Sequence, residues 1–173
     1  MKTGFYVKTG VITGLAVFMV FAAGVAVKKY NEHKMIRKFT AVIAKVVDGD
    51  TVVLIDGRKV RLLGIDAPET NHPDRPVQKY GEAAKQYLKK RVEGKECVFE
   101  YTLNEETDKY GRLLAMVYDG ETMINAEMVK KGYAYASESE HISKTKELLV
   151  LENIARKFRK GIWETQEGGQ AKK

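Results

Sequence analysis

Acidic side chains recur at the ends of apolar, β-branched segments in this chain. Asp50 follows Val47 in the sequence VDGDT, and Asp66 and Glu69 lie in RLLGIDAPET, which begins at Arg61. A rigid sheet can hold side chains at its strand ends so that they converge on one point. Carboxylate oxygens are the ligands that a hard cation prefers, and an arginine beside them suits a phosphate group. The pattern therefore predicts a site for metal-assisted phosphate chemistry.

Each of these features also has an ordinary structural explanation. The Asp-Gly-Asp sequence at 48–50 could be only a hairpin turn, because Asp-Gly is a common turn dipeptide. Arg61 could be an ion-pair partner on the face of a strand, and Arg112 could lay its aliphatic stem beside Tyr110. The occurrence of all of them in one order together with Glu69 favours the functional interpretation.

The elements that must position these residues indicate a small α+β domain. Apolar, β-branched segments predict five strands, at 41–47, 51–55, 58–65, 97–103 and 112–118. Apolar residues at helical spacing predict three helices, at 80–92, 125–131 and 142–160. By itself this periodicity supports only a small, mostly antiparallel α+β fold.

The last of these predicted helices, at 142–160, ends before Gly161. Ser137 and Glu140 have the spacing of a capping box near its start. The helix offers six apolar side chains to a core: Leu148, Leu149, Leu151, Ile154, Ala155 and Phe158. Trp163, just beyond the helix, is expected to pack back on the domain.

The formal net charge of +7 is concentrated near the N-terminus. Residues 1–38 hold seven Lys or Arg and one acidic residue, whereas residues 39–173 hold 23 basic and 22 acidic side chains. This distribution indicates a basic arm beside a membrane and not a basic nucleic-acid-binding face. An anionic substrate must therefore be attracted by locally placed Arg61, Arg112 and Lys109 and by a bound metal.

An uncharged run of 17 residues occupies positions 11–27. At about 1.5 Å per residue it nearly crosses a hydrocarbon core of about 30 Å, and it exceeds the usual signal-peptide core of about 7–15 residues. We predict five parts: a basic n-region at 1–10, an uncleaved transmembrane signal anchor at 11–27, a basic linker at 28–38, a folded domain at 39–164 and a disordered tail at 165–173. Cleavage near Ala26, with secretion of the domain, is the alternative.

Two residue types that often carry chemistry have ordinary explanations here. Cys97 is the only cysteine, which excludes an intramolecular disulfide, and its apolar surroundings in sequence predict core packing. His72 stands beside Pro73 and near Pro76, where a turn residue is more typical than a metal ligand.

The sequences VDGDT, at 47–51, and RLLGIDAPET, at 61–70, resemble the thermonuclease (staphylococcal nuclease) family. The similarity resumes with TDKYGR, at 107–112, ends with GIW, at 161–163, and covers about residues 39–164. The resemblance implies a five-stranded OB-fold β-barrel with three helices. The expected fold class is therefore α+β, an OB-fold barrel preceded by one N-terminal transmembrane helix.

The resemblance also implies an activity and a metal. Members of this family are endonucleases that hydrolyse DNA and RNA with Ca²⁺, show little sequence preference and leave 3′-phosphate ends. It implies that Asp50, Asp66 and the main-chain carbonyl of Ala67 bind the metal, although the family usually has threonine where Ala67 stands. An oxygen-only site favours Ca²⁺, with Mg²⁺ or Mn²⁺ as alternatives.

The other functional roles come from the same resemblance. Glu69 would hold or deprotonate the attacking water, Arg61 would clamp the phosphate, and Arg112 would stabilise the transition state or the leaving group. The resemblance also implies that Lys109 and Tyr110 bind substrate and that Tyr135, or alternatively Tyr133, packs near the nucleotide. Asp48 would lie behind the metal ligands.

Location and partners are also expectations. Two basic residues precede the apolar run and five follow it, so the positive-inside rule alone would keep the domain in the cytoplasm. A nonspecific nuclease is hazardous beside its own genome and most of the family is exported, so we expect an extracytoplasmic domain. DNA and RNA are the expected partners, no obligate protein partner is inferred, and a monomer is the default.

The sequence is also compatible with two functions other than a nuclease. The chain could be a noncatalytic OB-fold module, tethered to a membrane, that binds nucleic acid or a protein. Scaffold members would be expected to lose the acids and arginines, but Asp50, Arg61, Asp66, Glu69 and Arg112 are all present. The domain could also be an interaction module whose basic linker, at 28–38, binds anionic lipid.

Overall fold

The structure is a computed structural model that describes residues 18–21, 36–70, 79–103, 107–137 and 144–164. The chain divides into two compact units, Met1–Ile36 and Arg37–Lys173. Residues 18–21 are helical, and the rest of the predicted anchor, n-region and C-terminal tail lies outside the described residues. Among the residues that the structure describes, no helix has the length and apolar character needed to cross a membrane.

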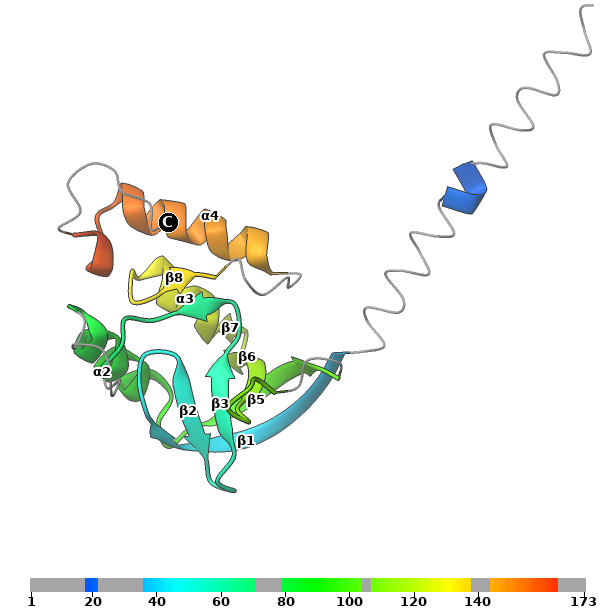
Figure 1. The fold of residues 1–173 in the computed structure, drawn as a ribbon, viewed down its shortest axis with the longest axis horizontal. Coiled ribbons are helices and arrows are strands. Elements are labelled where there is room, and N and C mark those ends of the chain that lie inside the picture. The colour runs from blue at the N-terminus through cyan, green and yellow to red at the C-terminus, as the bar shows by residue number, and fades with distance from the viewer. Residues whose placement is uncertain (1–17, 22–35, 71–78, 104–106, 138–143, 165–173) are drawn as a thin grey trace, which may run out of the picture. The chain divides into compact units, whose positions relative to one another are not determined.

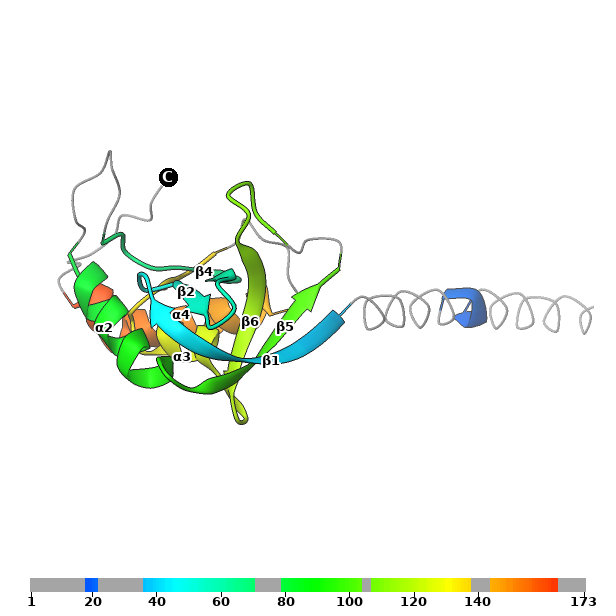
Figure 2. The same ribbon diagram turned by 90° about the horizontal axis from the view of Figure 1, so that it is seen from below.

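Three antiparallel strands form the first half of the main sheet. β1 (Ile36–Val46) pairs with β2 (Thr51–Leu54), and β2 pairs with β3 (Lys59–Leu62). The register of β1 shifts between Ile43 and Lys45, and such an irregularity bends a strand. The long curve of β1 carries it from β2 to β5 (Figure 2).

The second half of the sheet closes the barrel (Figure 1). β5 (Glu96–Thr102) pairs antiparallel with β6 (Leu113–Asp119), which continues to the short β7 (Thr122–Met123). β3 also pairs with β6 in parallel, so that the two ends of the sheet order β3-β2-β1-β5-β6 meet. The predicted five-stranded OB-like barrel is thereby confirmed.

A second, two-stranded sheet was not predicted. The strand predicted at 58–65 stops at Leu62, because Gly64 takes a positive φ of 77° and turns the chain. β4 (Ile65–Asp66) then pairs antiparallel with β8 (Tyr135–Ala136). The amide of Ser137 also donates to the carbonyl of Gly64 at 2.9 Å. The chain after β3 is therefore held by a segment far away in sequence.

In the described part of residues 37–173, three α-helices lie outside the barrel strands (Figure 1). α2 (Gly81–Val92) and α3 (Ile124–Lys130) match the helices predicted at 80–92 and 125–131 within one residue at each end. α4 (Thr145–Lys157) is shorter than the helix predicted at 142–160 and is followed by the 3₁₀ turn η1 (Gly161–Trp163).

Several boundary predictions are corrected by the structure. α4 ends early because Arg159 and Gly161 both take positive φ, which an α-helix does not permit. Phe158, predicted to reach the core, is 63% exposed as a result. α4 begins at Thr145, and its N-cap residue Lys144 makes no side-chain cap hydrogen bond. Glu140, one partner of the predicted capping box, lies outside the described residues. β1 begins at Ile36, within the residues predicted as linker.

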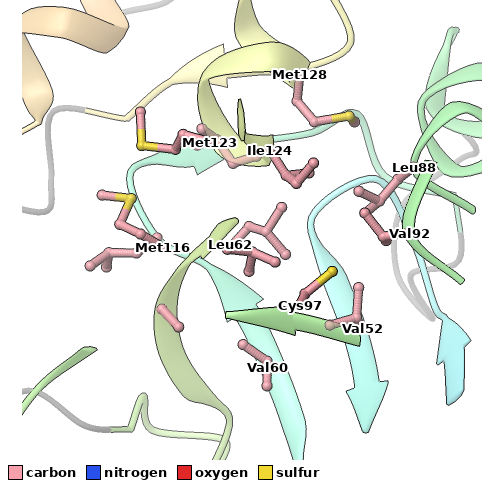
Figure 3. Close-up of a cluster of buried hydrophobic side chains, with 14 of the residues drawn as sticks. Val52, Val60, Leu62, Leu88, Val92, Cys97, Met116, Met123, Ile124 and Met128 are labelled. Carbon is pink, nitrogen blue, oxygen red and sulfur yellow. The ribbon is translucent and has the colours of Figure 1, made fainter. Parts of the chain in front are cut away.

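The core fills the barrel and the space beneath α2 and α3 (Figure 3). Val52, Val60 and Leu62 from the barrel lie in one buried cluster with Leu88 from α2 and Met128 from α3, and all five are at most 1% exposed. The Cys97 thiol lies in this cluster, and burial raises its pKa to about 11. Its predicted role in core packing is confirmed. A second cluster holds Trp163 against the end of α4.

Asn125 is a fully buried polar side chain at the start of α3. Its Oδ1 accepts a hydrogen bond from the amide of Val117 at 2.9 Å, and its Nδ2 donates to the carbonyls of Leu63 at 2.8 Å and Ala115 at 3.3 Å. A buried amide is stable only when its donors and acceptor are satisfied, as they are here. Asn125 thus ties α3 to β6 and to the segment that leaves β3.

Replacing this amide should destabilise the whole domain. In an Asn125→Ala variant the Val117 amide and the Leu63 carbonyl lose the partner that the structure shows, at about 1–3 kcal/mol for each buried unsatisfied group. We expect the free energy of unfolding to fall by about 3 kcal/mol, measured by urea denaturation. Glu121→Ala, an exposed change in the preceding turn, is the control. A midpoint equal to that of the control would contradict the assignment.

Candidate active site

The turn between β1 and β2 presents the first two acids. The carbonyl of Thr51 accepts a hydrogen bond from the Val47 amide at 2.9 Å, which closes the turn. Asp48 Oδ1 accepts from the Asp50 amide at 3.1 Å, an Asx-type bond within the turn. Asp48 therefore has the structural role of a turn residue, as the hairpin alternative predicted. Burial and the neighbouring Asp50 raise the pKa of Asp48 to about 7.

Asp50 is nearly buried and is held by three different segments. Its Oδ2 lies 2.6 Å from Arg61 Nη1 and accepts from the Ala67 amide at 3.1 Å. Its Oδ1 accepts from Thr51 Oγ1 at 2.9 Å. A Cβ at Gly49 would approach the Cβ of Ala67 to 2.6 Å, so only glycine lets the turn lie this close to the second acidic segment.

Arg61 joins the two predicted metal-binding acids. Its Nη1 bonds Asp50, and its Nη2 lies 3.2 Å from both Asp66 Oδ1 and the carbonyl of Ile65. Burial lowers the pKa of Arg61, but Asp50 and Asp66 outweigh this effect and raise it, so the guanidinium stays charged. Arg61 therefore forms ion pairs in this structure, as the structural alternative predicted. The same contacts bring both acids to one point.

Glu69 lies in the loop after β4, and the start of α2 supports that loop. A Cβ at Gly81 would lie 2.8 Å from the carbonyl oxygen of Glu69 and 2.9 Å from that of Pro68. Tyr80, the residue before the helix, takes a positive φ of 73°, and its hydroxyl donates to Glu164 at 2.9 Å. The position of the Glu69 main chain therefore depends on close contact with a glycine.

Arg112 is positioned from the opposite side by Asp108. The Asp108 carboxylate accepts from Arg112 Nε and lies 2.7 Å from Nη2, and its other oxygen accepts from the Tyr110 and Arg112 amides. Burial raises the pKa of Asp108, but these bonds outweigh it and hold the pKa below the ordinary value. Arg112 Nη1 donates to Thr51 Oγ1 at 3.3 Å. Thr51 thus links Arg112 to Asp50 through one hydroxyl.

Lys109 and Tyr110 flank Arg112 at the surface. Tyr110 is 71% exposed, and its ring centroid lies 5.1 Å from Lys109 Nζ and 5.5 Å from Arg112 Cζ. An exposed ring between two cations can face an anionic ligand, so the substrate-binding prediction for this pair stands as a prediction.

The remaining candidates have mainly structural surroundings. The Tyr135 backbone is paired with Asp66 between β8 and β4, but its ring packs edge-on against Trp163 at 5.2 Å. Burial, followed by Asp66, raises the pKa of Tyr135. The Tyr133 ring stacks on Tyr87 at 4.5 Å. His72 lies outside the described residues.

The structure adds four residues whose importance the sequence did not reveal. Asp108 was visible only as part of the sequence TDKYGR, where an aspartate three residues before a glycine signals a turn. Gly49 and Gly81 make the close approaches described above, and Thr51 connects the two halves of the site. No periodicity marks these contacts, because each depends on a partner distant in sequence.

The donor atoms at this point are suited to a hard cation. Asp50 and Asp66 supply carboxylate oxygens within reach of one guanidinium, and the main chain of Ala67 lies against Asp50. Within the described ranges, no three His, Cys, Asp or Glu side chains form a group that could hold a metal ion. A cation here would therefore need carbonyl and water oxygens in addition to the two carboxylates, a combination that Ca²⁺ accepts.

Comparisons with known proteins show which family the chain belongs to. Residues 59–165 match the family described as "Staphylococcal nuclease homologue". The chain is 38% identical over 133 residues to the thermonuclease of Staphylococcus intermedius, which covers 75% of this chain and 79% of that protein. It is 36% identical to the thermonuclease of Staphylococcus hyicus, over 70% of this chain and 73% of that protein, and 33% identical to the endonuclease YncB of Bacillus subtilis, over 77% and 64%. The chain belongs to the staphylococcal nuclease homologue family.

Proposed function

We propose that this protein is a nuclease that hydrolyses phosphodiester bonds in DNA and RNA. The observation that carries the proposal is the convergence of Asp50, Arg61 and Asp66 at one end of the barrel, with Arg112 joined to them through Thr51. Two carboxylates and two arginines at one point suit a phosphodiester and its counter-ion. Family membership and the names of the relatives, thermonuclease and endonuclease, support the same reaction.

We propose Ca²⁺ as the metal of this site, with Mg²⁺ or Mn²⁺ as alternatives. Asp50, Asp66 and the main-chain carbonyl of Ala67 would hold it. When bound, a Ca²⁺ ion would neutralise charge on the phosphate oxygens and favour attack at phosphorus. Arg61, which contacts both Asp50 and Asp66 in this structure, would then be able to turn one of its N–H groups toward substrate.

Each proposed catalytic residue has a separate role in the hydrolysis. Glu69 accepts a proton from the attacking water, whose oxygen forms the new bond to phosphorus. Arg61 and Arg112 donate hydrogen bonds to the phosphate oxygens as the charge there increases. The bond from phosphorus to the 5′-oxygen breaks, that oxygen takes up a proton from water, and the product keeps a 3′-phosphate. Asp108 and Thr51 hold Arg112 in place for this role.

Contacts of this kind give little sequence preference. The arginines and the proposed metal address phosphate groups, which are the same at every nucleotide. Lys109 and Tyr110, which are exposed beside Arg112, would contact a neighbouring phosphate and sugar. We therefore expect single-stranded DNA, double-stranded DNA and RNA all to be substrates, at different rates.

We also propose that residues 11–27 anchor the protein in a membrane and that the domain faces the extracytoplasmic side as a monomer. The uncharged 17-residue run supports the anchor. The five basic residues after it would by themselves favour the cytoplasmic side, and the extracytoplasmic placement is proposed because a nonspecific nuclease is hazardous beside its own genome. Protease treatment of intact cells and of lysed cells tests the orientation. Digestion only after lysis would contradict it, and recovery of the domain in the medium would favour the alternative of a cleaved signal peptide.

The decisive experiment measures cleavage by the purified full-length protein with Ca²⁺ and with a chelator. We expect single-stranded DNA and RNA to be cleaved with Ca²⁺, cleavage to stop when the chelator is added, and 3′-phosphate ends on the products. Mg²⁺ and Mn²⁺ are compared at equal concentration. Calorimetric titration with Ca²⁺ reports metal binding separately from activity. A folded protein that cleaves nothing with any of the three metals would contradict the proposal and favour a binding module.

A Gly81→Ala variant tests how the Glu69 loop is positioned. The added methyl group would meet the Glu69 and Pro68 carbonyls at under 3.0 Å, so α2 and the loop must separate. A displacement on the order of 1 Å at a catalytic group can reduce the rate about 100-fold, and we expect a loss of this size in kcat. Ala83→Ser, an exposed change in the same turn of α2, is the control. Equal rates in both variants would contradict this positioning role.

A further inference from the structure

A hollow of about 300 Å³ lies on the barrel surface. Phe39 from β1, Tyr101 from β5, and Arg58 and Lys59 at the start of β3 line it, together with Gly111. We call it the Phe39–Tyr101 hollow. None of these residues takes part in the reaction described above, and the volume is at the lower end of the range for small-ligand pockets.

The aromatic wall of the hollow is rigid. Phe39 stacks on the buried Phe99, with centroids 5.1 Å apart and planes inclined by 12°. Tyr101 packs edge-on against Phe39 at 5.9 Å and 68°. Because Phe99 belongs to the core, the rings of Phe39 and Tyr101 are held in place before any ligand arrives. A preformed wall binds a flat ligand without first having to be ordered.

Arg58 adds a flat cationic surface to this wall. Its Cζ lies 4.3 Å from the centroid of the Phe39 ring. Asp56 fixes the guanidinium, since its Oδ2 lies 2.7 Å from both Nε and Nη2 of Arg58. A guanidinium held over an aromatic ring leaves its other face toward solvent, and nucleobases stack on such planes as they do on aromatic rings. The ion pair therefore orients Arg58 without removing its stacking surface.

Two connections lead from the hollow to the candidate active site. Lys59 and Arg61 are two residues apart on β3 and so lie on the same face of the strand, about 6.6 Å apart. Gly111, which lines the hollow, stands directly between Tyr110 and Arg112 in the chain. A nucleic-acid strand whose phosphate contacts Arg61 and Arg112 thus has the hollow within a short distance along its backbone.

We propose that the Phe39–Tyr101 hollow binds a nucleobase of a single-stranded part of the substrate, close to the scissile phosphate. The base stacks on Arg58 beside the edge of Tyr101, and Lys59 contacts a phosphate between that base and Arg61. Stacking and phosphate contacts together are the usual means by which single strands are bound without sequence preference. This subsite deepens the proposed function and rests on the placement of substrate at Arg61 and Arg112.

Binding of short DNA tests the subsite separately from catalysis. Fluorescence anisotropy compares a labelled single-stranded 10-mer with a labelled dinucleotide, with Ca²⁺ present, for full-length protein carrying Glu69→Gln to prevent cleavage. Tyr101→Leu and Arg58→Gln are each added to this protein. We expect about tenfold weaker binding of the 10-mer for each, the size of effect seen for loss of one stacked base, and unchanged binding of the dinucleotide.

A charge variant provides an independent readout. Lys59→Gln should reduce the slope of log Kd against log salt concentration by about 0.7 for the 10-mer, the value for one phosphate contact to a single strand. Lys90→Gln is the matched control, because Lys90 is an exposed lysine on α2 outside the hollow. Circular dichroism and thermal unfolding establish that each variant is folded.

The outcomes separate this proposal from the proposed function. Equal loss of binding for the 10-mer and the dinucleotide, or no loss for either, would overturn the subsite, and cleavage by the parent protein would still establish the nuclease. Selective loss for the 10-mer would support the subsite even if the parent protein proved unable to cleave. The same slope change for Lys59→Gln and Lys90→Gln would show that only diffuse charge attracts the strand.

Discussion

A Glu69→Gln protein is expected to fold normally and to cleave DNA about 100- to 10,000-fold more slowly than the parent. General-base catalysis contributes about this factor, and glutamine cannot accept a proton from water. The amide is nearly the same size as the carboxyl group, so the loop supported by Gly81 should keep its course. The measurement is the single-turnover rate with saturating Ca²⁺, together with the thermal unfolding midpoint.

Glu82→Gln is the matched control for this experiment. Glu82 is exposed in the first turn of α2, and its carboxylate accepts from Gln86. The same chemical change at that position should leave the cleavage rate unaltered. A Glu69→Gln rate within twofold of the control would remove Glu69 from the proposed mechanism, and water activation would have to be assigned elsewhere.

The second large effect is expected from Arg112→Ala, which should reduce kcat about 100- to 1,000-fold. This is the usual cost of removing one donor that stabilises the charge of the transition state. The turn itself should survive, because Asp108 would still accept hydrogen bonds from the amides of Tyr110 and residue 112. The measurement is the separation of kcat from KM by steady-state kinetics, with circular dichroism to check folding.

Arg112→Lys distinguishes charge from geometry at this position. Lysine keeps the positive charge but cannot bond Asp108, Thr51 and a phosphate oxygen at the same time. We expect a kcat between those of the parent and Arg112→Ala. A change in KM alone would show that Arg112 only helps to bind substrate, contrary to the proposed role in the transition state.

The individual strands and helices could be predicted from local sequence signals, whereas their closure into a barrel was implied only by the family resemblance. The five barrel strands alternate buried and exposed residues or are continuously apolar, and α2 and α3 repeat their apolar residues at helical spacing. β4 and β8 were missed because strands of two residues have no measurable periodicity. The early end of α4 was missed because Arg159 adopts a positive φ that its residue type does not indicate.

The residues of the candidate site could be predicted from the sequence, but the hydrogen bonds and ion pairs between them could not. The order of Asp50, Arg61, Asp66, Glu69 and Arg112 along the chain identified which residues to examine. Arg61 forms ion pairs with both Asp50 and Asp66, and Arg112 donates a hydrogen bond to Thr51, which lies 61 residues earlier. Both arrangements arise only in the folded chain. Such bonds depend on the parallel pairing of β3 with β6, which no local pattern encodes.

The ties from Asn125 and Ser137 to the Leu63–Gly64 segment also concern how the protein is made. Every main candidate residue, from Asp50 to Arg112, leaves the ribosome before the segment that braces the acidic loop is synthesised. A growing chain that ends before Ile124 has these side chains but lacks α3, β8 and α4. If RNA is a substrate as proposed, we expect the chain to acquire its braced acidic loop beside messenger RNA only after the residues from Ile124 onward have been made.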